Sequence, residues 1–385
     1  ESVATRISGP KRACGFESAA AKQDHPEALY QRGDMLLNGR GTGANFPAAA
    51  KDLLRAAEQG HAGAQFAIAG LYEEGKGVER SLDSALYWLQ VSAMQDFAQS
   101  FFHLGINLLA QADNDKKIDT ALSWIIKAAD NNEQHAQYAL SQIYLRGNGV
   151  IVDIERGENL LKAAADNGLA EAQFGYARRE IEKGSDSSVV APFMVAAAEQ
   201  GFVSAFLQAA QFLRDGEGVE NDLSRAAFFF KQAADNGDAH AQLETARNFD
   251  NGFGMPKDRE EAVRYYQLSA AQGLIEAEMK LAEAFNQGDG IKADFKQAFV
   301  YYMRAAKKGN VDAAYNLGMM LQAGIGTQVD LQSAANWYEI AAKKGQLESQ
   351  VNLGLLYVGG ESFLQDFERA HMWFNIAAAN GHKDA

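Results

Sequence analysis

Pairs of glycines separated by one residue recur along the chain at nearly constant intervals. They begin at Gly39, Gly75, Gly147, Gly216, Gly252, Gly288 and Gly324, so four of the six intervals are 36 residues and the others are 72 and 69. A single period of roughly 20 to 50 residues is typical of stacked repeat architectures. A phosphate-binding loop would be one glycine-rich turn ending in Gly-Lys-Ser/Thr or opening a βαβ unit, and no such ending follows these pairs. The spacing predicts structural turns.

Residues 60–95 show how one repeat is built. Small and apolar residues at helical spacing over 62–73 predict a first helix. Gly75 and Gly77 then end it, because glycine adopts the positive φ found at helix C-termini. Ser81 is a suitable N-cap for a second helix, whose apolar stripe includes Trp88 and Leu89. Each repeat is therefore expected to be a helical hairpin.

Residues taken at the repeat period form uniform columns, which predict how successive hairpins pack. A column in the first helix contains only alanine and serine: Ala28, Ala64, Ser100, Ala136, Ala172, Ala205, Ala241, Ala277, Ala313, Ser349 and Ala385. A column in the second helix is bulky and holds all four tryptophans: Phe16, Asp52, Trp88, Trp124, Leu160, Phe193, Phe229, Tyr265, Tyr301, Trp337 and Trp373. Only Asp52 departs, and Leu53 and Leu54 are placed to compensate. Rings set against small residues predict interdigitated packing, with the tryptophans mostly buried.

The motifs that recur together in these repeats resemble those of Sel1-like repeats, which are related to the tetratricopeptide repeat. They are A-x-x-L-G, a tyrosine, G-x-G and A-x-x-W/Y-Y, as in "AGAQFAIAGLYEEGKGVERSLDSALYWLQ" and "AAYNLGMMLQAGIGTQVDLQSAANWYEIAAKKG". The resemblance covers nearly the whole chain. It implies an all-α, right-handed superhelical solenoid that acts as an adaptor or scaffold. It also implies a bacterial protein, often an exported one, in host interaction, envelope regulation or polysaccharide export.

The domain organisation follows from the same period. We expect residues 25–385 to form about ten stacked hairpins, preceded by an incomplete repeat at 1–24 that supplies only a second helix. The repeat near 169–201 is shortened by three residues and lacks its glycine pair. Two interpretations stay open there: drift of a loop, or a change of superhelical pitch that divides the array near residue 185. Pro192 is compatible with a helix only near the start of that helix.

The two ends of the chain lack the polar capping repeats that usually close such an array. We therefore expect the chain to be a segment of a longer array, or to associate end to end with a partner or another copy. The contact surfaces would lie near Ala13 to Ala20 and near Gly381 to Ala385.

Composition and charge exclude several classes of function. The net charge is −14 and no basic stripe is present, which excludes nucleic-acid binding and disfavours anionic membranes. No run of 18 apolar residues exists, so membrane insertion is not expected. The single cysteine, Cys14, excludes an intrachain disulfide framework and a cysteine zinc site. The resemblance favours a periplasmic or secreted location, with the cytoplasm left open.

The sequence offers few candidates for metal-binding or catalytic residues. The seven histidines lie at least one repeat apart or at unrelated positions, so they are not expected to converge on a metal, and we expect no cofactor and no catalytic residue. A first-helix column is apolar throughout: Tyr30, Phe66, Phe102, Tyr138, Phe174, Leu207, Leu243, Met279, Tyr315 and Val351. We interpret it as hairpin core, although exposed rings in this column could stack against sugars or peptides.

Three functions are consistent with these observations. The leading hypothesis is a non-catalytic scaffold that binds a protein or peptide ligand on its concave face, in envelope signalling or host interaction. The alternatives are a scaffold for polysaccharide export or cell-wall remodelling, and a hydrolase. Exposed groove aromatics would favour the second, and converging acids with perturbed pKa values would favour the third.

The binding face is predicted from the positions that vary between repeats. The first and fourth residues after the A-x-x-L-G glycine are not uniform, whereas packed columns are, so these positions should face solvent. In the middle of the array they are Arg178, Gln211, Arg214, Arg247, Asp250, Glu283 and Asn286. Three arginines there suit a carboxylate or an acidic peptide. The alternative is that they only pair with nearby Glu and Asp.

Overall fold

The computed structural model describes residues 24–41, 43–147, 149–359 and 365–382. Over these residues the secondary structure is entirely helical, with α-helices α2 to α21 and one 3₁₀ turn, η2. The chain divides into two compact units, Glu1–Arg179 and Glu180–Ala385, which we treat separately. The boundary lies close to the irregular repeat that the sequence singles out.

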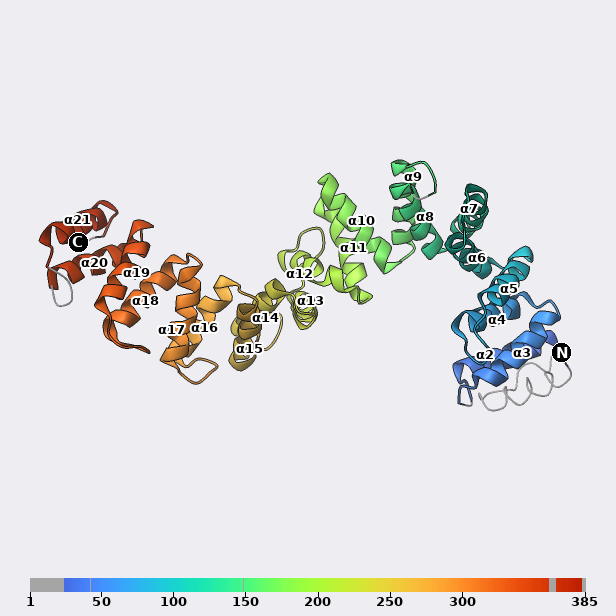
Figure 1. Ribbon diagram of the computed structural model, residues 1–385, viewed down its shortest axis with the longest axis horizontal. Helices are drawn as coiled ribbons and strands as arrows, with labels where there is room; N and C mark the ends of the chain where they lie inside the picture. The colour runs from blue at the N-terminus through green and yellow to red at the C-terminus, as the bar shows by residue number, and fades with distance from the viewer. Residues whose placement is uncertain (1–23, 42, 148, 360–364, 383–385) are drawn as a thin grey trace. The chain divides into compact units, whose positions relative to one another are not determined.

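The helices of the first unit follow one another in pairs (Figure 1). Each pair is a hairpin, and its second helix packs against the first helix of the next hairpin from α2 through α9. The bounds are α2 (Pro26–Asn38), α3 (Phe46–Glu58), α4 (Ala62–Glu74), α5 (Leu82–Met94), α6 (Ala98–Ala110), α7 (Asp115–Asp130), α8 (Gln134–Arg146), α9 (Ile154–Asp166) and α10 (Ala170–Lys183), which crosses the boundary.

The second unit continues the same plan. Its elements are α11 (Ser187–Glu199), η2 (Val203–Ala205), α12 (Phe206–Asp215), α13 (Leu223–Asp235), α14 (Ala239–Asn251), α15 (Arg259–Ala271), α16 (Ile275–Gln287), α17 (Phe295–Lys307), α18 (Val311–Ala323), α19 (Leu331–Lys343), α20 (Leu347–Gly359) and α21 (Phe367–Ala379). Pro192 lies inside α11, beyond its first turn, so the expected position near the helix start is wrong. The helix instead accommodates the loss of one backbone hydrogen bond.

Local sequence signals explain where the helices begin and end. All ten second helices, α3 to α21, start at an Asn, Ser or Asp side chain that accepts a hydrogen bond from a backbone N–H of the first turn. Most first helices end at a left-handed glycine, such as Gly75 with φ of 69°. The glycine pairs are therefore helix terminators, as predicted.

The second glycine of five of the seven pairs has a further role that the sequence does not reveal. A Cβ atom on Gly254 would lie 1.9 Å from the backbone oxygen of Leu223, at the start of α13 in the preceding hairpin. Gly218 and Gly326 approach Ser187 and Phe295 in the same way, at 2.0 and 2.2 Å. These positions require glycine both for their positive φ and because one backbone lies directly against another.

The two packing columns are observed. In the small column Ala64, Ala136 and Ala241 are completely buried. In the bulky column Trp373 is buried, and Trp88, Trp124 and Trp337 are buried over more than half of their surface. The Trp124 ring packs against Phe101 at 5.6 Å between centroids, and the Lys127 ammonium lies 5.3 Å from its centre. All four tryptophans are therefore mostly buried, as expected, and Trp373 is the most enclosed of them.

Asp52, the exception in the bulky column, is held by an ion pair. Its carboxylate is almost fully buried and accepts hydrogen bonds from Nε and Nη2 of Arg32, both at 2.6 Å. Arg32 itself occupies the leucine position of the A-x-x-L-G motif. One hairpin thus replaces two apolar residues by a mutually paired acid and base, while Leu53 remains buried as expected.

Buried glutamines link successive hairpins. Gln65 donates from Nε2 to the backbone oxygen of Ala57 in the preceding hairpin, at 3.1 Å, and its Oε1 accepts from Gln95 at the end of its own hairpin, at 2.7 Å. The equivalent bonds recur at Gln137, Gln242 and Gln350. At Glu278 the same place is taken by an ion pair with Lys308 at 2.8 Å. We call this set of interactions the glutamine ladder, and the interactions made by one hairpin a rung.

Some sequence predictions fall outside the described residues. These are the incomplete repeat at 1–24 except Asp24, the surface from Ala13 to Ala20, and the last three residues of the C-terminal surface. Among the described helices, none combines the length and the apolarity that crossing a membrane requires.

Candidate functional site

The predicted contact positions lie on the surface of their first helices, as their variability suggested. Arg178, Gln211 and Asn286 are exposed, and Arg214, Arg247, Asp250 and Glu283 are half-buried. Arg178 belongs to the first unit and the other six to the second. The guanidinium of Arg178 lies 6.0 Å from the centre of the Phe174 ring.

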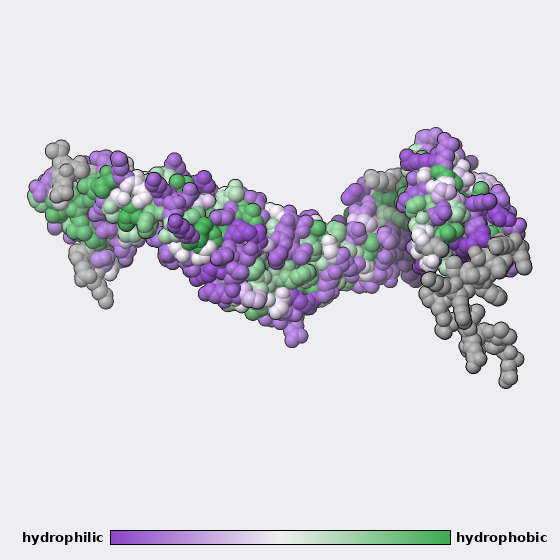
Figure 2. Space-filling view, turned by 90° about the horizontal axis from the view of Figure 1, so that it is seen from below, coloured by the Kyte–Doolittle hydropathy of each residue, from purple (hydrophilic) through white to green (hydrophobic). Residues whose placement is uncertain are grey.

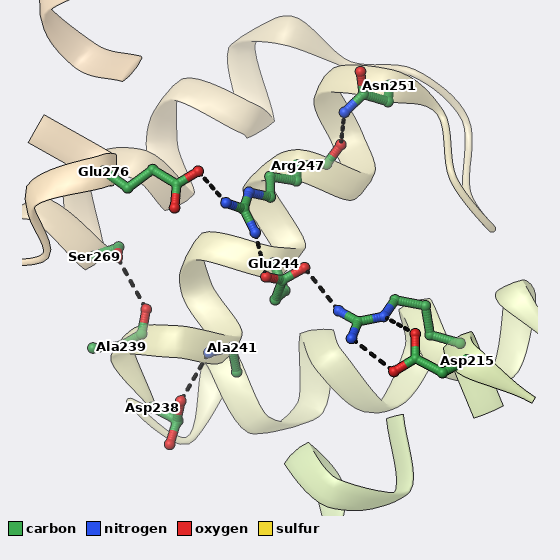
Figure 3. A network of polar contacts seen from close by, with 10 residues as sticks. Asp215, Asp238, Ala239, Ala241, Glu244, Arg247, Asn251, Ser269 and Glu276 are labelled. Atoms are coloured by element: carbon green, nitrogen blue, oxygen red, sulfur yellow. Dashed lines mark hydrogen bonds and ion pairs between the residues drawn. The ribbon is translucent and has the colours of Figure 1, made fainter. Parts of the chain in front are cut away.

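In the second unit Arg214 and Arg247 both donate to the carboxylate of Glu244, which Figure 3 shows between Arg247 and Asp215. Arg214 donates to Asp215 at 2.8 and 2.9 Å and to Glu244 at 3.3 Å. Arg247 donates to Glu244 at 2.5 Å and also to Glu276. The hydrogen bonds from Arg214 lower the pKa of Asp215 below its ordinary value.

This network argues against the expectation that the arginines are free to bind a carboxylate or an acidic peptide. Three carboxylates surround two guanidinium groups, so the cluster is not locally positive. The contacts match the alternative interpretation, in which these arginines pair with nearby acids. Figure 2 likewise shows hydrophilic and hydrophobic residues interspersed along the visible face. Whether these residues bind a partner stays a prediction.

Asp250 and Glu283 border a small cavity of about 160 Å³, together with Arg259, Tyr266 and Lys280. Each acid pairs with a base: Asp250 with Arg259, and Glu283 with Lys280 at 2.9 Å. Burial raises the pKa of Tyr266 to about 12. The carboxylates of Asp250 and Glu283 are therefore each paired with an adjacent cation.

The first unit contains a more open site, which the sequence did not single out. A cavity of about 640 Å³ runs along α2 and α4, bordered by Tyr30, Asp34, Phe66, Gly70 and Glu73. Asp34 and Gly70 occupy the same column as Arg178 and Arg247, and Leu37 and Glu73 the next one. A second cavity of about 300 Å³ shares Phe66 and His103 with the first and extends to Phe102 and His135. The two columns thus also border this cavity, although the sequence had singled out only their members in the middle of the array.

The first-helix aromatic column forms one wall of this site. Tyr30, Phe66 and Phe102 are half-buried rather than enclosed, so the interpretation as hairpin core is only partly right. The Tyr30 ring stacks on His61 at 4.5 Å, and Phe66 meets His103 edge to face at 5.2 Å. Burial raises the pKa of Tyr30, and the charges of Asp34 and Glu27 raise it further. The wall is thus aromatic and lies in a negative environment.

Two of the described histidines that border or adjoin these cavities have local structural partners. His61 caps α4 by accepting from the backbone N–H of Ala64 at 3.0 Å, while its Nε2 lies 2.8 Å from Glu27. His135 lies 2.8 Å from Glu133. Over the described part of the chain, no three His, Cys, Asp or Glu side chains are grouped in a way that could hold a metal ion.

A stack of paired helices with a polar, variable first-helix face defines this molecule as an α-helical repeat solenoid. The Sel1 repeat model matches nine segments: 26–61, 62–97, 104–133, 134–169, 207–238, 239–274, 275–310, 311–346 and 347–382. The chain therefore belongs to the Sel1 repeat family. The match leaves 170–206 uncovered, which is the region of the irregular repeat.

One solved structure supports this fold, and two further proteins are similar to parts or most of the chain. A protective antigen present in uropathogenic Escherichia coli strains, which displays an SLR fold, is 23% identical with a TM-score of 0.64, over 96% of this chain and 88% of that one. A Sel1 repeat protein from Oxalobacter formigenes is 22% identical with a TM-score of 0.43, over 92% and 96% of the two chains. An uncharacterized protein of Neisseria meningitidis serogroup B is 29% identical over 49% of this chain, and the match spans 39% of that protein's length.

Proposed function

We propose that the chain is a non-catalytic scaffold, or adaptor, that binds a protein or peptide ligand on the face formed by its first helices. One observation carries this proposal: variable first-helix positions of consecutive hairpins border open cavities. Asp34 and Gly70 do so in the first unit, and Asp250 and Glu283 in the second. Packing makes the other columns uniform, so the variable ones are those that a partner can select.

The face can be mapped by photo-crosslinking. A benzoylphenylalanine at Gln211 or Asn286, both exposed on first helices, is expected to crosslink a partner in extracts of the organism that encodes the chain. The same residue at Lys296 or Asn336, exposed on second helices, is the matched control and should give no such product. Equal or stronger crosslinking from the second helices would place the binding face elsewhere.

The arginines form a separate part of the proposal. Replacing Arg178, Arg214 and Arg247 together by alanine is expected to weaken capture of the partner while helicity by circular dichroism is retained. The control removes equal charge from second helices, at Lys162, Lys231 and Lys343, which form exposed ion pairs. If capture is unchanged in the folded arginine variant, none of the three arginines binds the partner, and Arg214 and Arg247 serve only intramolecular pairing with Glu244, Glu276 and Asp215.

We propose the bacterial envelope as the setting, with the chain periplasmic or secreted and acting in signalling or host interaction. This rests on the family membership and on the similarity in fold to the E. coli protective antigen. End-to-end association, or further repeats in a longer chain, would extend the same face.

A carbohydrate-linked scaffold, in polysaccharide export or cell-wall remodelling, is the second candidate. The observation that favours it is the partial exposure of Tyr30, Phe66 and Phe102 along open cavities, because such rings can stack on sugars.

A further inference from the structure

The two cavities of the first unit adjoin at Phe66 and His103 and together follow several hairpins, and we call them together the groove. Because they share Phe66 and His103, the path runs from Tyr30 on α2, across α4 and α6, to His135 at the start of α8. Packed helices lie about 8–10 Å apart, and an extended chain advances about 3.3 Å per residue. The part from α2 to α6 therefore suits an extended segment of about six residues.

The groove is acidic. Its larger part is bordered by the carboxylates of Asp34, Glu73 and Glu74 and by one ammonium, that of Lys76. Lys76 pairs with Glu74 at 2.6 Å, and Asp34 has an exposed contact of 3.4 Å with Arg40. Within this wall the half-buried carboxylate of Glu73 accepts a hydrogen bond of 2.7 Å from the neutral amide of Asn107. Among the described residues no cation pairs with it, although Arg80 bonds to its backbone oxygen.

The aromatic wall complements this charge. Tyr30, Phe66 and Phe102 offer partly exposed rings beside the carboxylates, and an aromatic face attracts a lysine or arginine cation within about 6 Å. A half-buried acid beside aromatic rings is therefore a favourable place for a basic side chain, and an unfavourable one for an acidic segment.

Gly70 provides the space for such a side chain. It lies in the middle of α4, borders the larger cavity, and a Cβ built on it would have no neighbour within 4 Å. The equivalent position carries a side chain in the other hairpins, for example Gln142 and Gln211. The groove is thus open where one hairpin lacks a side chain that the others have.

We infer that this groove binds an extended segment of a partner protein through a lysine or arginine side chain placed over the aromatic wall and against Glu73. The inference rests on the proposed function and specifies the chemistry of the partner in the first unit. The cation would supply the charged partner that Glu73 lacks among the described residues. The backbone of the segment would follow the groove past Gly70.

The test uses an unbiased library of displayed nonapeptides, selected on the full chain. We expect the selected peptides to be enriched in lysine or arginine. Their binding, measured by fluorescence anisotropy, should be lost in Gly70→Gln, which fills the groove. It should weaken about tenfold in Glu73→Gln, which keeps the acceptor for Asn107 but removes the charge. Gly359→Gln, an exposed helical glycine with open space around it, is the control and should bind normally.

The variants also separate blocked binding from damage to the fold. Gly70→Gln replaces a helical glycine, so its thermal midpoint should not fall. Selected peptides that are acidic or neutral, or that bind Gly70→Gln as well as the natural chain, would overturn the inference, as would a selection without enrichment. Gly70-dependent binding of glycans on an array, in place of peptides, would overturn it in favour of a carbohydrate ligand. Crosslinking at Gln211 and Asn286 reports the proposed function independently, so the two can fail separately.

Discussion

Replacing Gly254 by alanine is expected to lower the free energy of unfolding of the second unit by about 3 kcal/mol. Two effects add. A non-glycine residue is strained at φ of 69°, and the new Cβ would lie 1.9 Å from the Leu223 oxygen, so two hairpins must move apart. Urea denaturation followed by circular dichroism measures the loss.

Gly237→Ala is the matched control for this variant. Gly237 also has a positive φ, 95°, but nothing lies within 4 Å of its Cβ position. It should therefore lose only the backbone contribution, about 1 kcal/mol. Equal losses in the two variants would mean that the close approach between hairpins carries no energetic weight.

Replacing Asp52 by asparagine is expected to destabilise the first unit by about 2–3 kcal/mol. Removing one member of a buried ion pair leaves the other uncompensated, which lowers the free energy of unfolding by about 3–5 kcal/mol. The Arg32 side chain keeps 22% of its surface exposed, which reduces this loss. Thermal and urea unfolding of the purified variant would measure it.

A double variant distinguishes the pair from simple damage to the core. Arg32→Leu with Asp52→Leu restores the apolar residues found at these positions in other hairpins, such as Leu104 and Leu160. We expect it to recover most of the lost stability, because apolar replacement of a buried pair is often neutral. If the double variant is as unstable as Asp52→Asn, the two residues do not act as a pair.

The helices, their caps and the hairpin order could be predicted because their signals are local and repeat. A capping side chain such as Ser81 and a terminating glycine such as Gly75 each act within one turn of helix. The Sel1 family and the all-α class followed from the same period. The mostly buried position of the tryptophans also followed from these columns, although part of a large ring such as Trp124 reaches the surface.

The candidate site depended on neighbours that a single repeat does not contain. The columns identified a variable face, but the partners of Arg247 lie on the same helix, at Glu244, and in the next hairpin, at Glu276. The groove in the first unit arises where Gly70 is small and the adjacent rings are incompletely covered, which depends on the packing of several hairpins. Arg32 and Asp52 were detectable in principle, because both depart from apolar columns within one hairpin.

The glutamine ladder bears on how such a gene can change length. Each hairpin that has a rung supplies both of its side chains, Gln65 with Gln95 or Glu278 with Lys308, and takes only a main-chain oxygen from the hairpin before it. A main-chain oxygen is present whatever the sequence of that predecessor. Recombination that duplicates or deletes one 36-residue period within a unit would therefore leave every rung complete, even between hairpins of different polarity. Arrays of this kind can lengthen or shorten in whole periods without compensating mutations at the new junction.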